Sequence, residues 1–410
     1  MSAQAGSDAI AIVGMGCRYA GAASAAQFWD NLRAGRDRFT RGGPVPPGDG
    51  PRDIPAWGLI PDRNHYDAGL VGYTGETADR DPQHGMLYEA LWAAAEDAGV
   101  RLSDIGPSTA VYAGVARTKH VERGTFESTV DKDATFAGPH FSYFHDLHAE
   151  SIMVDASCAT GLVVVHLACQ SLRLGDCDYA LAGGVAVMDT DGSYEYTPNG
   201  IYSSEGMCRP FDRASTGTVP GDGVGAVLLR RLDDALADGD PIHAVIRSTA
   251  VDNDGRQKAG FTIPGVEGKI RVVTKALAGA GLTGADLGYV EAHGVGIPMN
   301  DQIEATALTE ALGSEGQPLA VGSVKASIGH TDTAAGLAAL IKTAFAVEHG
   351  FLPATPNTGD PIDELTAGGN RFSIVPEGRE WTPAGPRRAG VMSAGIGGTN
   401  AFAVLEQVPC

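Results

Sequence analysis

The sequence predicts an α/β protein in which buried sheets are covered by helices. Three observations lead to this fold class. Continuous apolar runs of strand length recur along the chain, helical segments lie between several of them, and the 56 glycines gather in short clusters beside the runs. With 410 residues, 43% of them hydrophobic, the chain is long enough for one large duplicated domain or for two to three ordinary domains.

The first half of the chain contains runs with the length and apolar character of buried strands. They lie at residues 9–13, 110–113, 151–155, 179–187 and 225–229. Residues 86–98 are predicted to form a helix, because Leu87 and Leu91 recur at helical spacing and Gly99 ends the pattern. Residues 42–55 are rich in proline and glycine and are expected to form a surface loop.

The second half repeats the same alternation of strands and helices. Strands are predicted at residues 243–251, 287–291, 319–324, 389–393 and 401–405, and helices at 269–280 and 334–349. The acidic, glycine-containing segment 233–240 separates the two sets of elements. We therefore expect two similarly built halves, 1–240 and 241–410.

Bulk composition excludes several classes of protein. A net charge of −20 argues against general binding of nucleic acids or anionic membranes. No apolar run reaches the roughly 20 residues that a membrane-spanning helix needs. Six cysteines without a C-x-x-C pair fit a reducing compartment, so a cytoplasmic location is expected and a zinc site is not. Gly14 and Gly16 do not form a dinucleotide loop, because Tyr19 occupies the third-glycine position.

Cys158 is the strongest candidate for a nucleophile. It ends a strand-like run and opens an apolar helix, where unpaired backbone N–H groups and the helix dipole favour a thiolate and can hold an oxyanion. Small residues follow at Ala159, Thr160 and Gly161, so this helix can approach neighbouring backbone closely. From this segment alone, Cys158 is either a nucleophile or a buried packing residue.

Two histidines, His293 and His330, each follow a predicted strand and lie beside glycines that leave the imidazole edge open. Either one alone is more often a structural residue. Together with a candidate thiolate they suggest thioester chemistry, in which the thiolate accepts an acyl group and the imidazoles donate hydrogen bonds to a developing oxyanion or enolate. Spacing along the chain does not show whether the three segments converge.

Several motifs, in order along nearly the whole chain, resemble those of β-ketoacyl synthases, and most closely the ketosynthases of modular polyketide synthases. The matching segments are Ile10 to Arg18, Phe28-Trp29, Asp81-Pro82-Gln83, residues 152–162, Cys208 to Asp212, Glu291 to Gly294, Lys325 to His330, and Gly398 to Ala401. The resemblance implies the five-layered α/β/α/β/α thiolase fold of two similar halves, normally a homodimer. It identifies Cys158 as the acyl-accepting nucleophile, with His293 and His330 assisting decarboxylation and stabilising the enolate.

The resemblance also implies supporting residues. Lys325 is expected to organise the site electrostatically, paired with Glu304 because a buried charge needs a partner, and Asp301 matches a further supporting position. A purely structural ion pair explains Lys325 and Glu304 equally well. The oxyanion hole and acyl pocket are expected from Cys158, Ala394, Gly395 and Ile396. The phosphopantetheine arm belongs to the acyl carrier protein, so no cofactor or metal bound by the chain itself is expected.

The chain departs from the family pattern beside this site. Val295 and Ile297 replace two threonines of the family's E-A-H-G-T-G-T segment that help to hold the pantetheine arm, and Thr262 is the remaining candidate contact there. Each lost hydroxyl hydrogen bond is worth about 1 kcal/mol. Ala394 replaces a gating phenylalanine, which enlarges the acyl pocket, and Ile396 replaces a residue that is often aromatic.

Two reactions therefore stay open. A polyketide-type β-ketoacyl synthase moves an acyl chain from a carrier-protein thioester to Cys158 and condenses it with a decarboxylated malonyl-type thioester. The alternative is a specialised synthase that does not extend the chain, either an acyltransferase or a cyclase that forms a carbon–carbon bond within a tethered chain. The retained cysteine and histidines disfavour a third reading, a noncatalytic partner protein resembling a chain-length factor.

Because the chain ends soon after Glu406, we expect a freestanding synthase or an excised domain that meets the acyl carrier protein in trans. Carrier proteins are typically acidic, so docking requires a basic surface patch despite the negative net charge. The candidates for this patch are Arg209, Arg256, Lys258 and Lys269.

Overall fold

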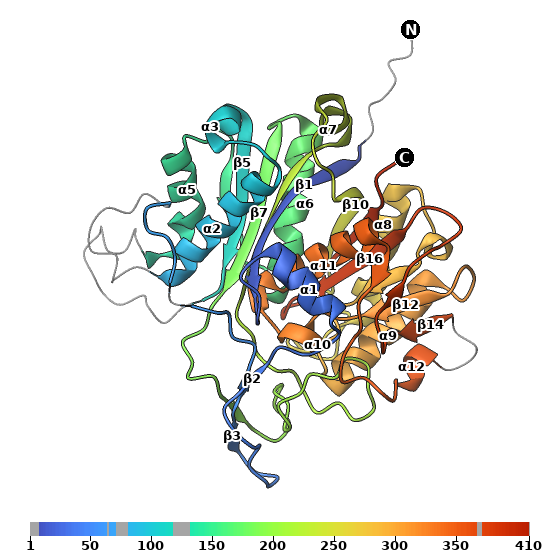
Figure 1. Cartoon of the computed structure of the whole chain (residues 1–410). Coiled ribbons are helices and arrows are strands. Elements are labelled where there is room, and N and C mark those ends of the chain that lie inside the picture. Colours follow the sequence, from blue (N-terminus) through green and yellow to red (C-terminus); the bar gives the residue numbers. More distant parts are fainter. Residues whose placement is uncertain (1–7, 64, 71–80, 118–131, 367–370, 410) are drawn as a thin grey trace.

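The computed structural model describes residues 8–63, 65–70, 81–117, 132–366 and 371–409 (Figure 1). Eleven of the described strands form one continuous sheet in the order β14-β12-β11-β16-β17-β10-β1-β9-β7-β5-β6. The half from the first part of the chain comprises β1 (Ile10–Tyr19), β5 (Thr109–Val115), β6 (Ser151–Met153), β7 (Tyr179–Ala186) and β9 (Gly223–Arg231). The other half comprises β10 (Ala244–Asn253), β11 (Tyr289–Glu291), β12 (Leu319–Gly322), β14 (Phe372–Ile374), β16 (Arg388–Ala394) and β17 (Thr399–Glu406).

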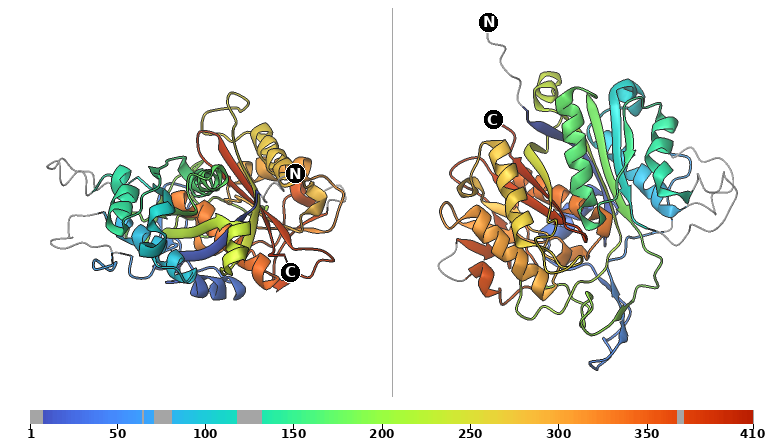
Figure 2. Two further views of the ribbon diagram at one scale, coloured as in Figure 1. Left: turned by 90° about the horizontal axis from the view of Figure 1, so that it is seen from above. Right: turned by 180° about the vertical axis from the view of Figure 1, so that it is seen from behind.

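Helices cover both outer faces of this sheet and fill the space between its halves, as the view from above in Figure 2 shows. Helices α2 (Pro82–Asp97) and α5 (Ala137–His145) cover one half, and α8 (Val266–Ala280) and α9 (Pro298–Leu312) cover the other. The central layer is formed by α6 (Thr160–Leu174) and α11 (Ala335–His349), which share one apolar core with strands of both halves. The five-layered α/β/α/β/α thiolase fold expected from the sequence is confirmed.

All ten predicted strands and the three predicted helices are present, with bounds that differ by a few residues. The predicted loop at 42–55 is exposed over most of its length, but Arg52–Ile54 forms strand β3, which pairs with β8 (Tyr194–Tyr196). Ile54 explains this pairing, since its side chain belongs to a small buried apolar cluster. The acidic segment predicted as a boundary contains helix α7 (Leu232–Asp238).

The two halves are joined by strand β1, which pairs with β9 on one side and with β10 on the other. The glycines near Met15 serve packing rather than ligand binding. A Cβ atom at Gly14 would lie 1.9 Å from the Ala94 carbonyl of α2, and one at Gly16 would lie 2.2 Å from the Ala90 carbonyl. Only glycine permits this approach of helix to strand.

The central helices cross at their first turns, where two glycines face each other. A Cβ atom at Gly161 would lie 2.8 Å from the Leu337 amide, and one at Gly336 would lie 2.6 Å from the Leu162 amide. The small residues that the sequence places after Cys158 therefore do allow close backbone approach. This crossing brings the N-terminus of α6 next to the N-terminus of α11.

Helix α6 with its preceding turn is the one stretch of the described residues with the length and apolar composition of a membrane span. It is 61% buried inside the protein. Its position in the central layer accounts for its composition, because a helix that packs on all sides is apolar all round.

Candidate active site

Cys158 lies in a tight turn between strand β6 and helix α6. It is the middle residue of the 3-10 turn η3, which begins at Ser157 with a positive φ of 53°. The Thr160 hydroxyl donates to the Ser157 carbonyl at 2.6 Å, and the Ser393 hydroxyl donates to the Cys158 carbonyl at 2.9 Å. A non-glycine residue in left-handed conformation persists only where its surroundings hold it. These bonds therefore fix the thiol in the position that η3 gives it, with 9% of the residue exposed.

The ionisation of Cys158 differs from the expectation of a resting thiolate. Burial, followed by the charge of Asp332, raises the pKa of the Cys158 thiol to about 11, although a hydrogen bond from Ser157 and the charge of Lys325 oppose the rise. The helix N-terminus is thus outweighed by desolvation and by a neighbouring carboxylate. The raised pKa favours the thiol, which runs against the tendency of a helix N-terminus to favour the thiolate.

Asp332 is a site residue that the sequence reasoning missed. It begins the turn η5 (Asp332–Ala334) before helix α11, with a positive φ of 41°, as Ser157 begins the turn before α6. Its backbone N–H donates to Nδ1 of His330 at 3.2 Å, and its carboxyl interacts with the Cys158 thiol. Its position two residues after a candidate histidine was the available signal.

The two histidines converge from different elements, since His293 follows strand β11 and His330 follows helix α10 (Lys325–Ile328). The ring centroids of His293 and His330 lie 5.6 Å apart, with the rings nearly perpendicular at 85°. Nδ1 of His293 accepts the Ala394 N–H at 3.3 Å, and Nδ1 of His330 accepts the Asp332 N–H. A neutral imidazole that accepts at Nδ1 carries its proton at Nε2. Each ring therefore presents an Nε2–H donor.

Both imidazoles are held neutral. Burial lowers the pKa of His293 well below its ordinary value, and the cations Lys325 and Lys269 add to this effect together with His330. Burial, aided by Lys325, lowers the pKa of His330 to about 3. At neutral pH the pair can donate hydrogen bonds but carries no charge.

Lys325 and Glu304 hold His293 from opposite sides of its backbone. Lys325, the first residue of α10 (Lys325–Ile328), donates from Nζ to the His293 carbonyl at 2.6 Å. Glu304 accepts the N–H groups of His293 and Gly294 at 2.7 and 2.8 Å. Burial lowers the pKa of Lys325 against the attraction of Glu304. Lys325 and Glu304 therefore attract each other electrostatically, but each side chain forms its hydrogen bonds with the backbone at His293 rather than with the other side chain.

A second buried charge pair, which the sequence reasoning also missed, supports the same region. Glu291 and Lys342 are both fully buried, with Nζ of Lys342 at 2.8 Å from the carboxylate. Glu291 also accepts the Val324 N–H at 2.5 Å and the hydroxyl of Tyr289. The pair therefore ties helix α11 to the strand that leads to His293 and to the turn that leads to Lys325.

Asp301 positions the loop that follows His293. Its carboxylate accepts the N–H groups of Val295 and Gly296 at 3.0 Å and that of Phe211 at 2.8 Å. Burial raises the pKa of Asp301 to about 7, against these three stabilising bonds. The predicted supporting residue thus holds backbone, and its protonation would loosen the loop.

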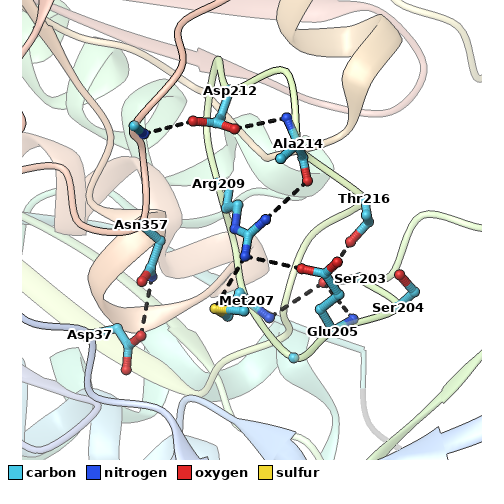
Figure 3. A network of polar contacts seen from close by, with 12 residues as sticks. Asp37, Ser203, Ser204, Glu205, Met207, Arg209, Asp212, Ala214, Thr216 and Asn357 are labelled. Carbon is cyan, nitrogen blue, oxygen red and sulfur yellow. Dashed lines mark hydrogen bonds and ion pairs between the residues drawn. The ribbon is translucent and has the colours of Figure 1, made fainter. Parts of the chain in front are cut away.

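The loop 203–216 contacts this segment and is fixed by its own polar network (Figure 3). Arg209 joins Glu205 at 3.1 Å and donates to the Ala214 carbonyl at 3.3 Å, while Asp212 accepts the Ala214 N–H at 2.8 Å. The neighbouring Cys208 thiol donates to the Val295 carbonyl at 3.4 Å. The network therefore reaches the loop after His293 through Cys208.

The turn 395–398 packs directly on the nucleophile turn. A Cβ atom at Gly395 would lie 2.4 Å from the Ala156 carbonyl and 3.4 Å from Ala159, so no larger residue fits without movement. The adjacent Ile396 is 56% exposed. Gly395 thus keeps the backbone of this turn against the peptide that precedes Cys158.

Two backbone N–H groups are free to hold an oxyanion. Within the described chain, neither the Cys158 N–H nor the Ile396 N–H donates to a protein acceptor. The Ala394 N–H is bound to His293, and the Gly395 N–H closes its own turn. Of the four residues expected to form the oxyanion hole and acyl pocket, Cys158 and Ile396 keep open donors, whereas Ala394 and Gly395 shape the surroundings.

The residues expected to bind the pantetheine arm have different exposures. Val295 is buried, Ile297 is half-buried and Thr262 is exposed. Thr262 follows Phe261, which is 74% exposed and whose ring lies 3.6 Å from the position of a Cβ atom on Gly397 in the 395–398 turn. The arrangement thus places apolar surface beside the turn that carries Ile396.

The predicted basic docking patch is wrong in one of its members. Lys269 is buried, and its Nζ donates to Asn400 at 2.9 Å, so it cannot lie on a surface. Arg209 is committed to the loop network described above, and Lys258 donates to the Phe261 carbonyl at 2.7 Å. Arg256 is exposed.

The described residues contain no group of three or more His, Cys, Asp or Glu side chains arranged to hold a metal ion. The chemical groups that the site offers are therefore a thiol, two neutral imidazoles and two open backbone donors, with buried Lys325 beside them. Together they suit nucleophilic acyl transfer and stabilisation of an oxyanion or enolate.

Comparisons with known proteins agree with this chemistry. The family described as "Beta-ketoacyl synthase, N-terminal domain" matches residues 7–235, and "Beta-ketoacyl synthase, C-terminal domain" matches residues 243–359. A phenolphthiocerol/phthiocerol polyketide synthase of Mycobacterium tuberculosis is 39% identical over 432 residues, which cover 97% of this chain and 22% of that protein. Polyketide synthase GfsE of Streptomyces halstedii is 39% identical over 430 residues, covering 98% and 11%. The chain thus spans about a fifth or less of these relatives.

Solved structures show the same similarity. Ketosynthase twelve from the bacillaene polyketide synthase of Bacillus amyloliquefaciens superposes with a TM-score of 0.92 at 31% identity, covering 98% of this chain and 75% of that one. An oxazolomycin ketosynthase domain of Streptomyces albus JA3453 superposes with a TM-score of 0.87 at 33% identity, covering 98% and 74%.

Proposed function

Because the chain belongs to the β-ketoacyl synthase family, we propose that it catalyses the condensation step of polyketide assembly, with Cys158 as the acyl carrier. The observation that carries the proposal is the convergence at the α6–α11 crossing of a buried thiol with two neutral imidazoles that each present Nε2–H. Lys325 and Glu304 are proposed as supporting residues that hold His293 in place.

In the first half-reaction, the Cys158 sulfur attacks the carbonyl of an acyl thioester on a carrier protein. The tetrahedral oxyanion is held by the N–H groups of Cys158 and Ile396, which are free to donate. The bond to the pantetheine sulfur then breaks, and the thiol proton of Cys158 ends on that departing sulfur. The products are an acyl thioester on Cys158 and a free carrier thiol.

In the second half-reaction, a malonyl-type thioester loses carbon dioxide, and the electrons of the broken bond form an enolate. The Nε2–H groups of His293 and His330 donate hydrogen bonds to the enolate oxygen. Because the pKa values of both histidines are lowered, both rings act as neutral donors. The enolate carbon attacks the acyl carbonyl on Cys158, and the carbon–sulfur bond breaks. The departing Cys158 thiolate takes up a proton from solvent, which restores the thiol, and the product is a β-ketoacyl thioester.

The partners and location follow as parts of the same proposal. The phosphopantetheine arm is supplied by an acyl carrier protein, and the chain itself needs no bound cofactor. A homodimer is supported by the edge position of β6 and by exposed Ile152, Tyr143 and Phe144 beside it, since an apolar edge strand is suited to pairing with a second copy. A reducing, cytoplasmic location is supported by the five cysteines of the described residues, all free thiols.

One observation favours a second candidate, a synthase that transfers or cyclises an acyl chain without extending it. Val295, Ile297 and Ala394 retain no polar or aromatic group for holding the pantetheine arm or narrowing the acyl pocket. A bulky or preformed chain fits such surroundings better than a short extender. The chemistry of Cys158 is shared by both candidates, so they differ only in what attacks the acyl enzyme.

Intact-protein mass spectrometry tests the proposal. Wild type and Cys158→Ala are incubated with acyl-carrier substrates and then with malonyl-carrier protein. We expect acyl mass on wild type only, followed by release of carbon dioxide and a two-carbon gain on the carrier-bound chain. If Cys158 is acylated but no carbon dioxide is released, the reaction is transfer or cyclisation rather than chain extension. If none of the acyl-carrier donors acylates Cys158, the proposal of a covalent intermediate is refuted.

A further inference from the structure

Lys269 is a buried cation that the proposed chemistry does not use. It lies in the first turn of α8, is 3% exposed, and donates from Nζ to Oδ1 of Asn400 at 2.9 Å. Its ammonium is attracted by the carboxylates of Glu304 and Asp254, while burial lowers the pKa of Lys269. Placing a cation here is costly, and an apolar side chain of similar length would fill the same space, so a role beyond packing is indicated.

On one side, Lys269 acts on the turn that carries the open Ile396 N–H. Asn400, oriented by Lys269, donates from Nδ2 to Asp254 at 2.7 Å and to the Gly398 carbonyl at 3.1 Å. The backbone N–H of Asp254 also donates to the Gly398 carbonyl, at 2.9 Å. The 395–398 turn is therefore anchored through an amide whose orientation depends on the ammonium, because Oδ1 faces Nζ and Nδ2 faces the carboxylate.

On the other side, Lys269 acts on the loop that carries His293. Glu304 is buried and accepts one backbone N–H group at each carboxyl oxygen, an arrangement that favours the ionised carboxylate. Lys269 is the strongest of the groups that favour this ionised form, followed by the two backbone donors and Lys325. Loss of the ammonium leaves Glu304 with less compensation for its burial.

We propose that Lys269 is a positioning residue that couples the oxyanion turn 395–398 to the His293 loop, through Asn400 on one side and Glu304 on the other. The inference rests on the proposed function, because it assigns both segments to one reaction. It states that the two loops lose order together when the ammonium is removed.

Hydrogen exchange followed by mass spectrometry tests the coupling without any substrate. Lys269→Met removes the charge and the donor but keeps the length of the side chain. Lys275→Met is the matched control, since Lys275 lies exposed on the same helix. We expect roughly tenfold faster exchange in peptides covering 293–297 and 395–398 in Lys269→Met, with little change elsewhere, and no change in the control. Faster exchange in only one of the two segments, or in neither, overturns the proposal.

A second variant keeps the test valid if Lys269→Met does not fold. Thermodynamic coupling is reciprocal, so Glu304→Gln, which leaves Lys269 in place, is expected to raise exchange in the distant 395–398 turn as well as at 293–297. If Lys269→Met does fold, exchange at 293–297 in the Lys269→Met/Glu304→Gln double variant is expected to match that of Glu304→Gln alone. Additive effects there, or an unaffected 395–398 turn in Glu304→Gln, would refute action through Glu304.

Kinetics separates positioning from a merely structural role. Lys269→Met is expected to lower kcat for Cys158 acylation by roughly tenfold to hundredfold with KM little changed, whereas Lys275→Met keeps both constants. A change confined to KM contradicts the proposal. If wild type itself shows no acylation, the proposed function fails, while the exchange measurements still decide whether Lys269 couples the two loops.

Discussion

The ionisation of Cys158 gives the sharpest test of the active-site electrostatics. Burial and the facing charge of Asp332 raise the pKa of the thiol to about 11. At pH 8 about one molecule in a thousand then carries the thiolate, against roughly one in four for a thiol of ordinary pKa. Only the thiolate reacts with iodoacetamide, so the alkylation rate of Cys158 is expected to rise about tenfold for each pH increment of one between 7 and 10, without a plateau.

The perturbation is Asp332→Asn, which removes the carboxylate charge and keeps a residue that tolerates the positive φ at this position. We expect the pKa of Cys158 to fall when this carboxylate charge is removed, so that alkylation at pH 8 becomes several-fold faster. Asp363→Asn is the control, because Asp363 is an exposed partner of Arg213 remote from the thiol.

The assay follows the tryptic peptide 133–173 at several pH values by tandem mass spectrometry, which distinguishes alkylation of Cys158 from that of Cys169 in the same peptide. Peptide resolution is needed because the chain holds other cysteines, among them Cys410, which lies outside the described residues. A wild-type plateau below pH 9 refutes the raised pKa. An unchanged rate in Asp332→Asn shows that burial alone raises it and that Asp332 has no part in controlling the thiol.

Three further predictions concern packing, stability and substrate range. Gly336→Ala places a Cβ atom 2.6 Å from the Leu162 amide; it should destabilise the fold by about 2 kcal/mol in urea titration and abolish Cys158 acylation, while Gly385→Ala, with open space around it, should do neither. Although burial opposes it, pairing with Asp97 and Glu348 raises the pKa of His243 to about 9, so its stabilisation is complete below the unfolded pKa near 6.5 and fades as the pH rises through 9. His243→Asn should therefore cost about 2 kcal/mol at pH 7 and almost nothing at pH 10, and an equal loss at both would exclude the charge. Ala394→Phe should lower kcat/KM for long acyl chains about tenfold relative to acetyl, and equal loss for both would exclude pocket size as the cause.

The sequence was sufficient for the architecture and for selecting candidate chemical residues that the structure brings together, because both leave local signals. Apolar runs marked the strands, and motifs marked Cys158, His293 and His330. It was insufficient for electrostatics, since the fields that act on a buried group come from residues distant in sequence. The helix N-terminus at Cys158 was expected to favour a thiolate. Asp332, which lies 174 positions further along the chain, instead raises the pKa of this thiol.

Lys269 illustrates the same limit from another side. A lysine near the start of a predicted helix is ordinarily a surface residue, and the patch assignment relied on that. Its burial depends on Asn400 and Glu304, which no local pattern connects to it. Lys325 and Glu304 were likewise selected from the sequence as supporting residues. That both of them hydrogen-bond to the backbone of His293 could be seen only in the tertiary structure.

The crossing of α6 and α11 fixes the positions of Cys158 and His330 independently of the segments that carry Val295 and Ala394. Gly161 and Gly336 allow helices α6 and α11 to pack in close contact inside the molecule, and this contact sets the spacing of Cys158 and His330. The segments that carry Val295 and Ala394 lie outside that contact, and the proposed function assigns them to the surroundings of the substrate. Under the proposed function, substitutions in those segments can therefore change which acyl chains are accepted while the distance between Cys158 and His330 stays the same. The same fold can then accept new substrates without a change in its reacting groups.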